Sequence, residues 1–133
     1  MKLYLDANAI IYLIEGTPQF KQAVRNRIAA LDLKHGDLLL TSRLSVLECR
    51  VKPLRDGRND LLSAYDAFLS QNFVRIVDVS AAVIDQATSL RARYRFKTPD
   101  SIHLASGIEE HVDQFLTADQ ALSRCTEIAV VLV

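Results

Sequence analysis

The chain is poor in the residues that mark disordered, disulfide-rich and membrane-spanning proteins. Its 133 residues include only four glycines, three prolines and no tryptophan, and 50% of them are hydrophobic. This composition leaves little room for a disordered linker and favours a single domain over residues 1–133. No stretch approaches the roughly 18 apolar residues of a membrane span, and an acid inside the apolar N-terminal segment argues against a signal peptide. We therefore expect a cytoplasmic protein.

Cysteine is also scarce, and its spacing excludes several kinds of site. Cys49 and Cys125 are the two cysteines of the chain, and neither lies in a pattern that binds a metal or forms a redox pair. In a reducing cytoplasm such residues are expected to be buried free thiols. No Ser–His–Asp or Cys–His arrangement indicates nucleophilic catalysis.

No surplus of either charge is present, because 16 basic residues balance 16 acidic ones. Bulk electrostatics therefore do not indicate a nucleic-acid-binding protein. Two local clusters are nevertheless basic. One comprises Arg43, Arg50, Lys52, Arg55 and Arg58, and the other comprises Arg91, Arg93, Arg95 and Lys97. By default, either cluster is a solvated helix face.

Short apolar segments alternate with longer segments of helical periodicity along the whole chain. Strands are expected at residues 2–5, 38–41, 74–77, 114–116 and 128–132, and helices at residues 7–14, 19–34, 42–51, 59–70, 80–94, 99–110 and 118–123. Pro53 and Gly57 are expected to separate the third helix from the fourth. Strands that alternate with helices form parallel sheets covered on both faces. The sequence thus predicts an α/β fold, a three-layer sandwich with a central, mostly parallel sheet of about four to five strands flanked by helices.

Two of three candidate aspartates lie where such a sheet would bind a ligand, because ligands gather beyond the carboxyl ends of parallel strands. Asp6 directly follows the first strand, and Asp119 follows the fourth. Asp100 lies in the first turn of a helix, where Thr98 is expected to be the cap and Pro99 the first helical residue. Each aspartate also has a purely structural explanation, since acids cap helices and interact favourably with the helix dipole.

Glu48 has no capping explanation, because it lies in the middle of a predicted helix. Leu44, Leu47 and Val51 are expected to form the buried stripe of that helix, and Glu48 lies one turn after Leu44 on the same stripe. A carboxylate that faces the core either meets a cation or takes up a proton.

Two kinds of cation would satisfy Glu48. An arginine, Arg43 or Arg91, would form a salt bridge. Alternatively, four carboxylates at one edge of the sheet would share a hard divalent ion, and Mg²⁺ or Mn²⁺ suits oxygen ligands.

Four sequence blocks, in their order and at their intervals, resemble the motifs of PIN-domain ribonucleases, in particular the VapC toxins of bacterial toxin–antitoxin pairs. The blocks are LDANAIIYLIEG, TSRLSVLE, KTPDSIHLA and FLTADQAL. Each block alone is common, whereas the ordered set is specific. The resemblance implies a metal cluster of four catalytic acids, together with two polar neighbours that hold carboxylates or water. The acids are Asp6, Glu48, Asp100 and Asp119, and the neighbours are Asn8 and Thr117.

The resemblance further implies an endoribonuclease that is the toxin of a toxin–antitoxin pair. Mg²⁺ or Mn²⁺ would bind the phosphate and activate the water that hydrolyses the phosphodiester bond. The substrate would be RNA, and Arg91, Arg93, Arg95 and Lys97 would contact its phosphate backbone. The expected protein partners are a cognate antitoxin and a second copy of the chain. The apolar run at residues 10–14 would offer the antitoxin a surface unless it is buried in the core.

Other functions remain open from the residues alone. A catalytically silent PIN-like fold would serve as an RNA- or protein-binding module, although a pure binder has no reason to keep four acids. A haloacid-dehalogenase-like phosphatase needs a second acid where this chain has Asn8, and a response-regulator receiver needs an acidic pair and a late lysine that are missing. His103 is expected to be a packed or hydrogen-bonded structural histidine, with a supporting role beside Asp100 as the alternative.

Overall fold

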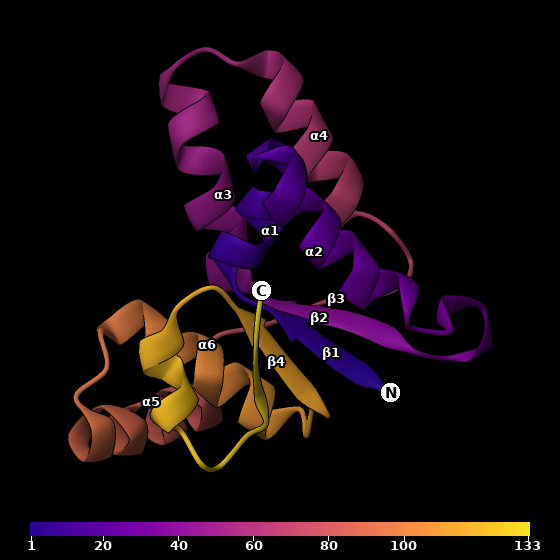
Figure 1. Cartoon of the computed structure of the whole chain (residues 1–133). Helices are drawn as coiled ribbons and strands as arrows, with labels where there is room; N and C mark the ends of the chain where they lie inside the picture. Colours follow the sequence, from indigo (N-terminus) through magenta and orange to yellow (C-terminus); the bar gives the residue numbers. More distant parts are fainter.

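The computed structural model describes residues 1–133, and a parallel sheet lies at its centre (Figure 1). The strands are β1 (Lys2–Leu5), β2 (Leu38–Ser42), β3 (Val74–Val77), β4 (Gln114–Thr117) and β5 (Val130–Leu132), and their order across the sheet is β3-β2-β1-β4-β5. All four neighbouring pairs are parallel. The carboxyl ends of the five strands therefore share one edge, with β1 in the middle.

Helices cover both faces of this sheet. The α-helices are α1 (Ala7–Glu15), α2 (Pro18–Ala29), α3 (Arg43–Arg55), α4 (Asn59–Leu69), α5 (Ala81–Tyr94) and α6 (Thr98–Glu109), and the 3₁₀ helices are η1 (Leu33–His35) and η2 (Gln120–Arg124). In Figure 1, α1 to α4 gather on one side of the sheet, and α5 and α6 on the other. None of these helices has the length and apolar character needed to cross a membrane.

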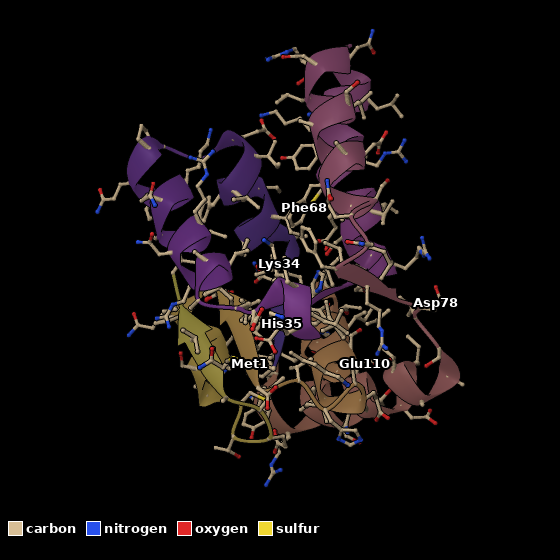
Figure 2. All side chains as sticks on the ribbon, turned by 90° about the vertical axis from the view of Figure 1, so that its right-hand side faces the viewer. Met1, Lys34, His35, Phe68, Asp78 and Glu110 are labelled. Atoms are coloured by element: carbon tan, nitrogen blue, oxygen red, sulfur yellow. The ribbon has the colours of Figure 1, made fainter.

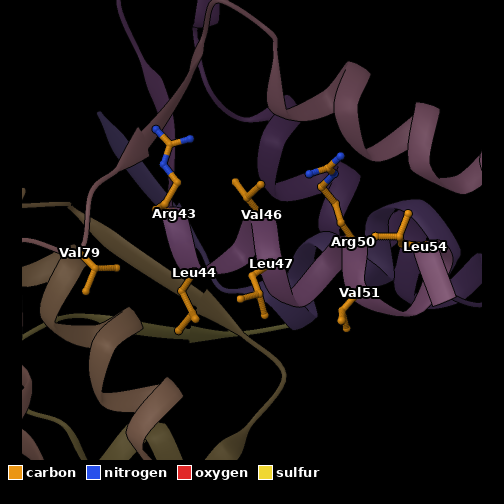
Figure 3. A pocket seen from close by; sticks show the side chains of 8 residues that line it. All are labelled: Arg43, Leu44, Val46, Leu47, Arg50, Val51, Leu54 and Val79. Carbon is orange, nitrogen blue, oxygen red and sulfur yellow. The ribbon is translucent and has the colours of Figure 1, made fainter.

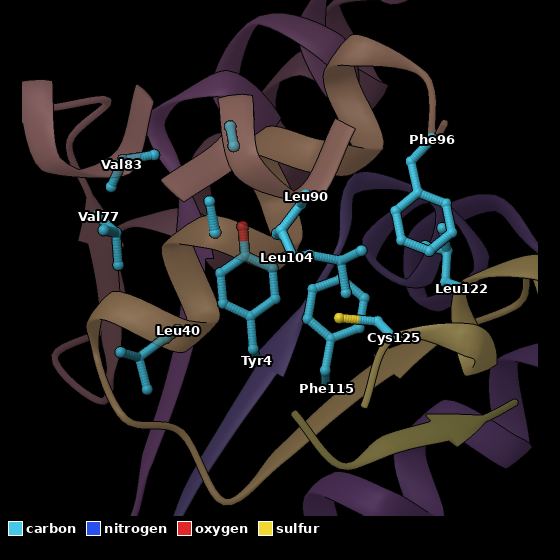
Figure 4. Close-up of a cluster of buried hydrophobic side chains, with 12 residues drawn as sticks. Tyr4, Leu40, Val77, Val83, Leu90, Phe96, Leu104, Phe115, Leu122 and Cys125 are labelled. Carbon is cyan, nitrogen blue, oxygen red and sulfur yellow. The ribbon is translucent and has the colours of Figure 1, made fainter. Parts of the chain in front are cut away.

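Alternate residues of the central strands face different layers. Leu3 and Leu116 belong to a buried cluster with residues of α1, α3 and α4, and Phe68 of α4 packs against it (Figure 2). Tyr4 and Phe115 belong to a second buried cluster with residues of α5 and α6 (Figure 4). Side chains two residues apart along a strand share a face, so the sheet separates two cores. The predicted three-layer α/β fold is confirmed.

The helix predicted over residues 19–34 is wrong at its end. The helix α2 stops at Ala29, and η1 follows as a separate turn. Asp37 causes the break, because its carboxylate accepts the Asp32 N–H at 2.8 Å. In a continuous helix that N–H would bond the carbonyl of Ile28 instead.

Pro53 does not end α3, contrary to the prediction. The helix continues to Arg55, and Pro53 is one of its buried residues. A proline near the end of a helix removes only the bond from its own nitrogen to the carbonyl of Cys49. The break comes at Gly57, whose φ of 67° is left-handed and suits a residue without a Cβ.

The two cysteines are buried free thiols, as predicted. Burial raises the pKa of Cys49 to about 12 and that of Cys125 to about 11. Both thiols therefore stay protonated at neutral pH and are poor nucleophiles.

The chain turns from α1 into α2 at Gly16, and we expect Gly16→Ala to destabilise this corner. A Cβ at this position would clash with the carbonyl oxygen of Tyr12, which accepts the Gly16 N–H at 3.0 Å. The backbone would have to move, at a cost of about 1–3 kcal/mol. Urea denaturation measures the free energy of unfolding. Thr17→Ala is the control, because Thr17 is exposed and makes no capping hydrogen bond; equal stability of the two variants would contradict the expectation.

Candidate active site

A small polar cavity lies beyond the carboxyl end of β1. Six residues line it, Asp6, Ala7, Asn8, Glu48, Asp100 and His103, and its volume is about 30 Å³. This space suits a water molecule or an ion rather than an organic ligand. The lining comes from α3, from the first two turns of α6 and from the start of α1 with its cap, so the fold brings three of the four predicted acids together.

Asp6 is held rigidly at the start of α1. One of its oxygens accepts the Ala9 backbone N–H at 2.9 Å, as expected for a helix cap, and the other accepts the Thr117 hydroxyl at 2.6 Å. The residue is only 4% exposed. Burial raises the pKa of Asp6, and the hydrogen bonds from Thr117 and Ala9 counteract part of that rise. Each oxygen still has a further lone pair for another partner.

Asp100 lies in the first turn of α6. Burial raises its pKa, and the negative charges of Asp119 and Asp6 raise it further. Thr98 is not the predicted cap, because the Lys97 carbonyl already accepts the first helical bond, from Ser101 at 3.0 Å. Lys97 is thus the cap residue, without a side-chain hydrogen bond.

Asp119 lies beside the cavity and is exposed. It caps η2, the short 3₁₀ helix that replaces the helix predicted over residues 118–123, and accepts the Ala121 N–H at 2.9 Å. Its own N–H donates to the Thr117 hydroxyl at 3.1 Å. Thr117 therefore connects Asp6 to Asp119. The negative charge of Asp119 raises the pKa of Asp100, although Asp119 does not line the cavity.

Glu48 reaches the cavity from α3, and neither of the expected arginines pairs with it. Arg43 lies 3.3 Å from Asp78, and Arg91 donates to the Phe96 carbonyl at 2.8 Å. The carboxylate of Glu48 instead lies 2.7 Å from Nε2 of His103.

The buried stripe predicted for α3 is wrong. Leu47 and Val51, two of its three residues, are 61% and 54% exposed. The buried face consists of Ser45, Cys49 and Pro53. Glu48 therefore lies at the margin of the buried face, and its side chain is 29% exposed.

Small side chains explain which face of α3 is buried. The hydroxyl of Ser45 shares a hydrogen bond of 2.7 Å with Thr41 at the end of β2, and Sγ of Cys49 lies 3.9 Å from the Ala7 carbonyl. These short side chains let the α3 backbone approach β2 and α1 closely, which leaves Leu47 and Leu54 exposed on the other face (Figure 3).

His103 is the buried, hydrogen-bonded histidine that the sequence predicted, and it also lines the cavity beside Asp100. It is 3% exposed, and Nδ1 lies 2.7 Å from the hydroxyl of buried Tyr4 while Nε2 contacts Glu48. The signal in the sequence was the three-residue spacing from Asp100, which places both side chains on one helical face. Tyr4 carried no such signal, because its strand pattern indicates a core residue.

The predicted RNA-binding run divides into two pairs. Arg91 is bound to the Phe96 carbonyl, and Arg93 lies 2.5 Å from Glu127. The side chains of Arg95 and Lys97 are exposed and form neither a salt bridge nor a hydrogen bond. The second pair is therefore the part of the run that is free for a ligand.

Two further expectations concern α1. The apolar run at residues 10–14 mainly fills the core, because Ile10 is fully buried and Ile11, Leu13 and Ile14 pack against the cluster beneath α1. Asn8 is exposed and lines the cavity.

The acids are close together without forming a ready coordination sphere. No group of three or more His, Cys, Asp or Glu side chains is arranged as metal ligands. Asp6 and Glu48 are directed at protein donors, namely Thr117, Ala9 and His103. None of Asp6, Asp100 and Asp119 forms a salt bridge. The edge of the sheet thus carries negative charge that no arginine or lysine pairs with.

Solved structures share this fold. A chain of VapBC2 from Rickettsia felis, bound to a DNA fragment from their promoter, is 20% identical with a TM-score of 0.82, over 99% of this chain and 98% of that one. A chain of a toxin–antitoxin complex from Klebsiella pneumoniae is 22% identical with a TM-score of 0.73, over 97% of this chain and 95% of that one. VapC20 of Mycobacterium tuberculosis, a sarcin–ricin loop cleaving toxin, is 16% identical with a TM-score of 0.74, over 92% and 93%.

The sequence itself decides the family. Comparison with curated proteins gives no match. The model of the PIN domain matches residues 3–128, a range that contains all six residues lining the cavity. The chain therefore belongs to the PIN domain family.

Proposed function

We propose that residues 1–133, as a single PIN-like domain, form a metal-dependent endoribonuclease that is the toxin of a toxin–antitoxin pair. One observation carries the proposal: Asp6, Glu48 and Asp100 line one cavity, and no arginine or lysine neutralises them. Support also comes from the structural neighbours, since VapC20 is a sarcin–ricin loop cleaving toxin and two others come from toxin–antitoxin complexes.

The donor set suits Mg²⁺ or Mn²⁺. Carboxylates are the hard oxygen ligands that these ions prefer, usually with several waters completing the shell. The raised pKa values of Asp6 and Asp100 have burial as their first cause, with neighbouring acids adding to it, and a cation would reverse both effects. Such an ion supplies charge stabilisation for the phosphodiester and an activated water.

The residues of the chain divide the remaining work. Asp6 is fixed by Thr117 and Ala9, so its free lone pairs have a defined direction. Asp100 and Glu48 offer oxygens from two other elements, and Glu48 orients the attacking water. Asp119 adds negative charge at the rim, and Asn8 offers an amide beside the acids.

Arg95 and Lys97 are the proposed contacts to the RNA backbone. Both are exposed and have no partner within the chain, and the charge of Lys97 is felt at Asp100. Phosphate contacts of this kind position a nucleic acid without reading its sequence. Arg91 and Arg93 are bound within the chain, so we assign them a smaller role.

A catalytically silent RNA- or protein-binding module is the second candidate. It is favoured by the lack of any three side chains already arranged as metal ligands. The two candidates differ in one outcome, because only the enzyme consumes RNA.

We further propose two protein partners, a cognate antitoxin and a second copy of the chain. The second copy fits an apolar groove of about 500 Å³ on α3, lined by Arg43, Leu44, Val46, Leu47, Arg50, Val51, Leu54 and Val79 (Figure 3). In a two-fold interface the same patch meets itself, so unpaired arginines would repel. Here Arg43 lies 3.3 Å from Asp78 and Arg50 lies 3.0 Å from Asp66, which removes that repulsion.

We expect Asp6→Asn and Asp100→Asn to lower the rate of RNA cleavage by about 100-fold or more, because each removes a ligand of the ion that would stabilise charge in the transition state. Initial rates on a single-stranded RNA with Mg²⁺ or Mn²⁺ measure the effect, and the products should carry 5′-phosphate and 3′-hydroxyl ends. Asp85→Asn is the control, because Asp85 is exposed on α5, away from the cavity and from the groove on α3. A folded wild-type protein that cleaves no RNA would favour the silent module.

In the metal-free protein, we expect Asp100→Asn to raise the free energy of unfolding at neutral pH. The folded state raises the pKa of Asp100 above 3.8, so the ionised carboxylate destabilises the fold, and the wild type loses stability as pH rises from 3.8 through the raised pKa. The gain in Asp100→Asn should therefore shrink as pH falls through that window. Urea titrations at several pH values measure it, with Asp85→Asn on the exposed face of α5 as control. A gain that does not depend on pH would contradict the electrostatic explanation.

We expect Leu47→Lys to convert the dimer to a monomer, because it places a charge at the centre of the apolar groove. Analytical ultracentrifugation gives the mass. Leu132→Lys on β5 is the matched control, since Leu132 is also an exposed leucine and lies outside the groove. A wild-type chain that is monomeric at high micromolar concentration would rule out this interface.

A further inference from the structure

Three side chains form a continuous hydrogen-bonded chain from the core to the cavity. Tyr4 is fully buried on β1 and stacks on Phe115 with ring centroids 4.9 Å apart (Figure 4). Its hydroxyl lies 2.7 Å from Nδ1 of His103, and Nε2 of His103 lies 2.7 Å from Oε1 of Glu48. The chain thus connects a fully buried core residue to Glu48, a partly exposed acid that lines the cavity.

The chemistry of the three groups sets the direction of the hydrogen bonds. An ionised carboxylate only accepts, so Nε2 carries the proton that is donated to Glu48. In the neutral ring Nδ1 then has no proton and accepts from the Tyr4 hydroxyl. A tyrosine hydroxyl carries its proton at neutral pH, so the Tyr4 hydroxyl is the donor in this bond.

A histidine at this place does what an arginine would not do. Glu48 is a flexible, partly exposed side chain, and no lysine or arginine holds it. A salt bridge to arginine would hold the carboxylate but also neutralise it. A neutral imidazole that donates from Nε2 holds the carboxylate and leaves its negative charge available for a cation.

We propose that Tyr4 and His103 are positioning residues that hold the Glu48 carboxylate towards the cavity, so that it binds a divalent ion there. The inference rests on the proposed function, since it concerns the same ion. It gives His103 the supporting role that the sequence left open, through Glu48, and adds Tyr4 behind it.

Two variants of His103 separate its two hydrogen bonds. The side-chain nitrogen of glutamine lies about where Nε2 lies, so His103→Gln keeps a donor for Glu48. Asparagine is shorter and offers its amide near Nδ1, so His103→Asn keeps a partner for Tyr4 and leaves Glu48 without one. We expect His103→Asn to weaken Mn²⁺ binding by about 10-fold, the lower end of the range for groups that orient a metal ligand, and His103→Gln to restore most of the affinity.

Isothermal titration with Mn²⁺ in the absence of RNA measures the dissociation constants. In a Glu48→Ala background, His103→Asn should weaken binding no further, because the residue acts through Glu48. Tyr4→Phe provides a second variant that keeps the stacked ring, and we expect it to weaken binding by a smaller factor. Equal Mn²⁺ affinity of the wild type, His103→Asn and Tyr4→Phe would overturn the positioning role while leaving the proposed function intact.

A metal-free measurement tests the hydrogen bonds separately. Nitrogen-15 NMR of the imidazole should show His103 as the neutral tautomer with its proton on Nε2, and that signal should shift in Glu48→Ala. A proton on Nδ1 would overturn the inference. A wild-type protein that binds no Mn²⁺ but shows the expected tautomer would refute the proposed function, and the role of the chain in ion binding with it.

Discussion

Uncompensated negative charge at the carboxyl edge of the sheet is the constraint on which the rest of the account depends. Asp6 is buried, Asp100 is half-buried, and the charges of neighbouring acids add to the rise in the pKa of both. No lysine or arginine pairs with either. Such a site costs folding free energy, and a cation that binds only the folded state recovers it. Binding of a cation to these acids would therefore stabilise the folded state.

The parallel sheet brings these acids together with little help from long side chains. β1 and β4 are neighbours, so Asp6 meets Thr117 through a single hydrogen bond of 2.6 Å. Asp6 also caps α1. The capping role and the role in the site are compatible, because a carboxylate has more lone pairs than the two bonds occupy. Ordinary helix chemistry thus fixes the direction of the central acid.

The helix α3 serves two purposes through its two faces. Its small buried residues, Ser45 and Cys49, let it lie close to β2 and α1, which carries Glu48 to the margin of the cavity. With this face of α3 against the sheet, Leu47, Val51 and Leu54 are exposed on the opposite face. Exposing an apolar face of this kind to water costs free energy, and a partner that covers it removes that cost. The position of Glu48 and the proposed dimer surface therefore have one structural cause.

Periodicity and the alternation of strands with helices predicted the larger part of the fold, and local hydrogen bonds limited the rest. β1 and β3 have the predicted bounds, because their apolar runs end at residues that cap or turn. The end of α2 was missed because the Asp37 carboxylate accepts the Asp32 N–H, which a longer helix would use for its own hydrogen bond. A pattern of hydrophobic residues does not reveal such a bond. The buried face of α3 was misjudged because apolar residues were assumed to face inwards, whereas small residues permit the closer approach.

The candidate site was predictable to a similar degree. The positions of Asp6 and Asp119 follow from strand ends, that of Asp100 follows from the motif resemblance, and the three-residue spacing brought His103 into view. The partner of Glu48 did not follow, because an imidazole and an arginine are equally plausible in sequence. Tyr4 was hidden for a different reason: its ring is a core residue, and only its hydroxyl serves the site.

Anomalous scattering from crystals grown with Mn²⁺ would locate a shared ion directly. We expect a peak in the cavity, with carboxylate oxygens of Asp6 and Asp100 about 2.0–2.2 Å from it, near the distance that small hard cations demand. Cavity density that is only water, in crystals where Mn²⁺ binds elsewhere, would contradict the claim that these acids share an ion.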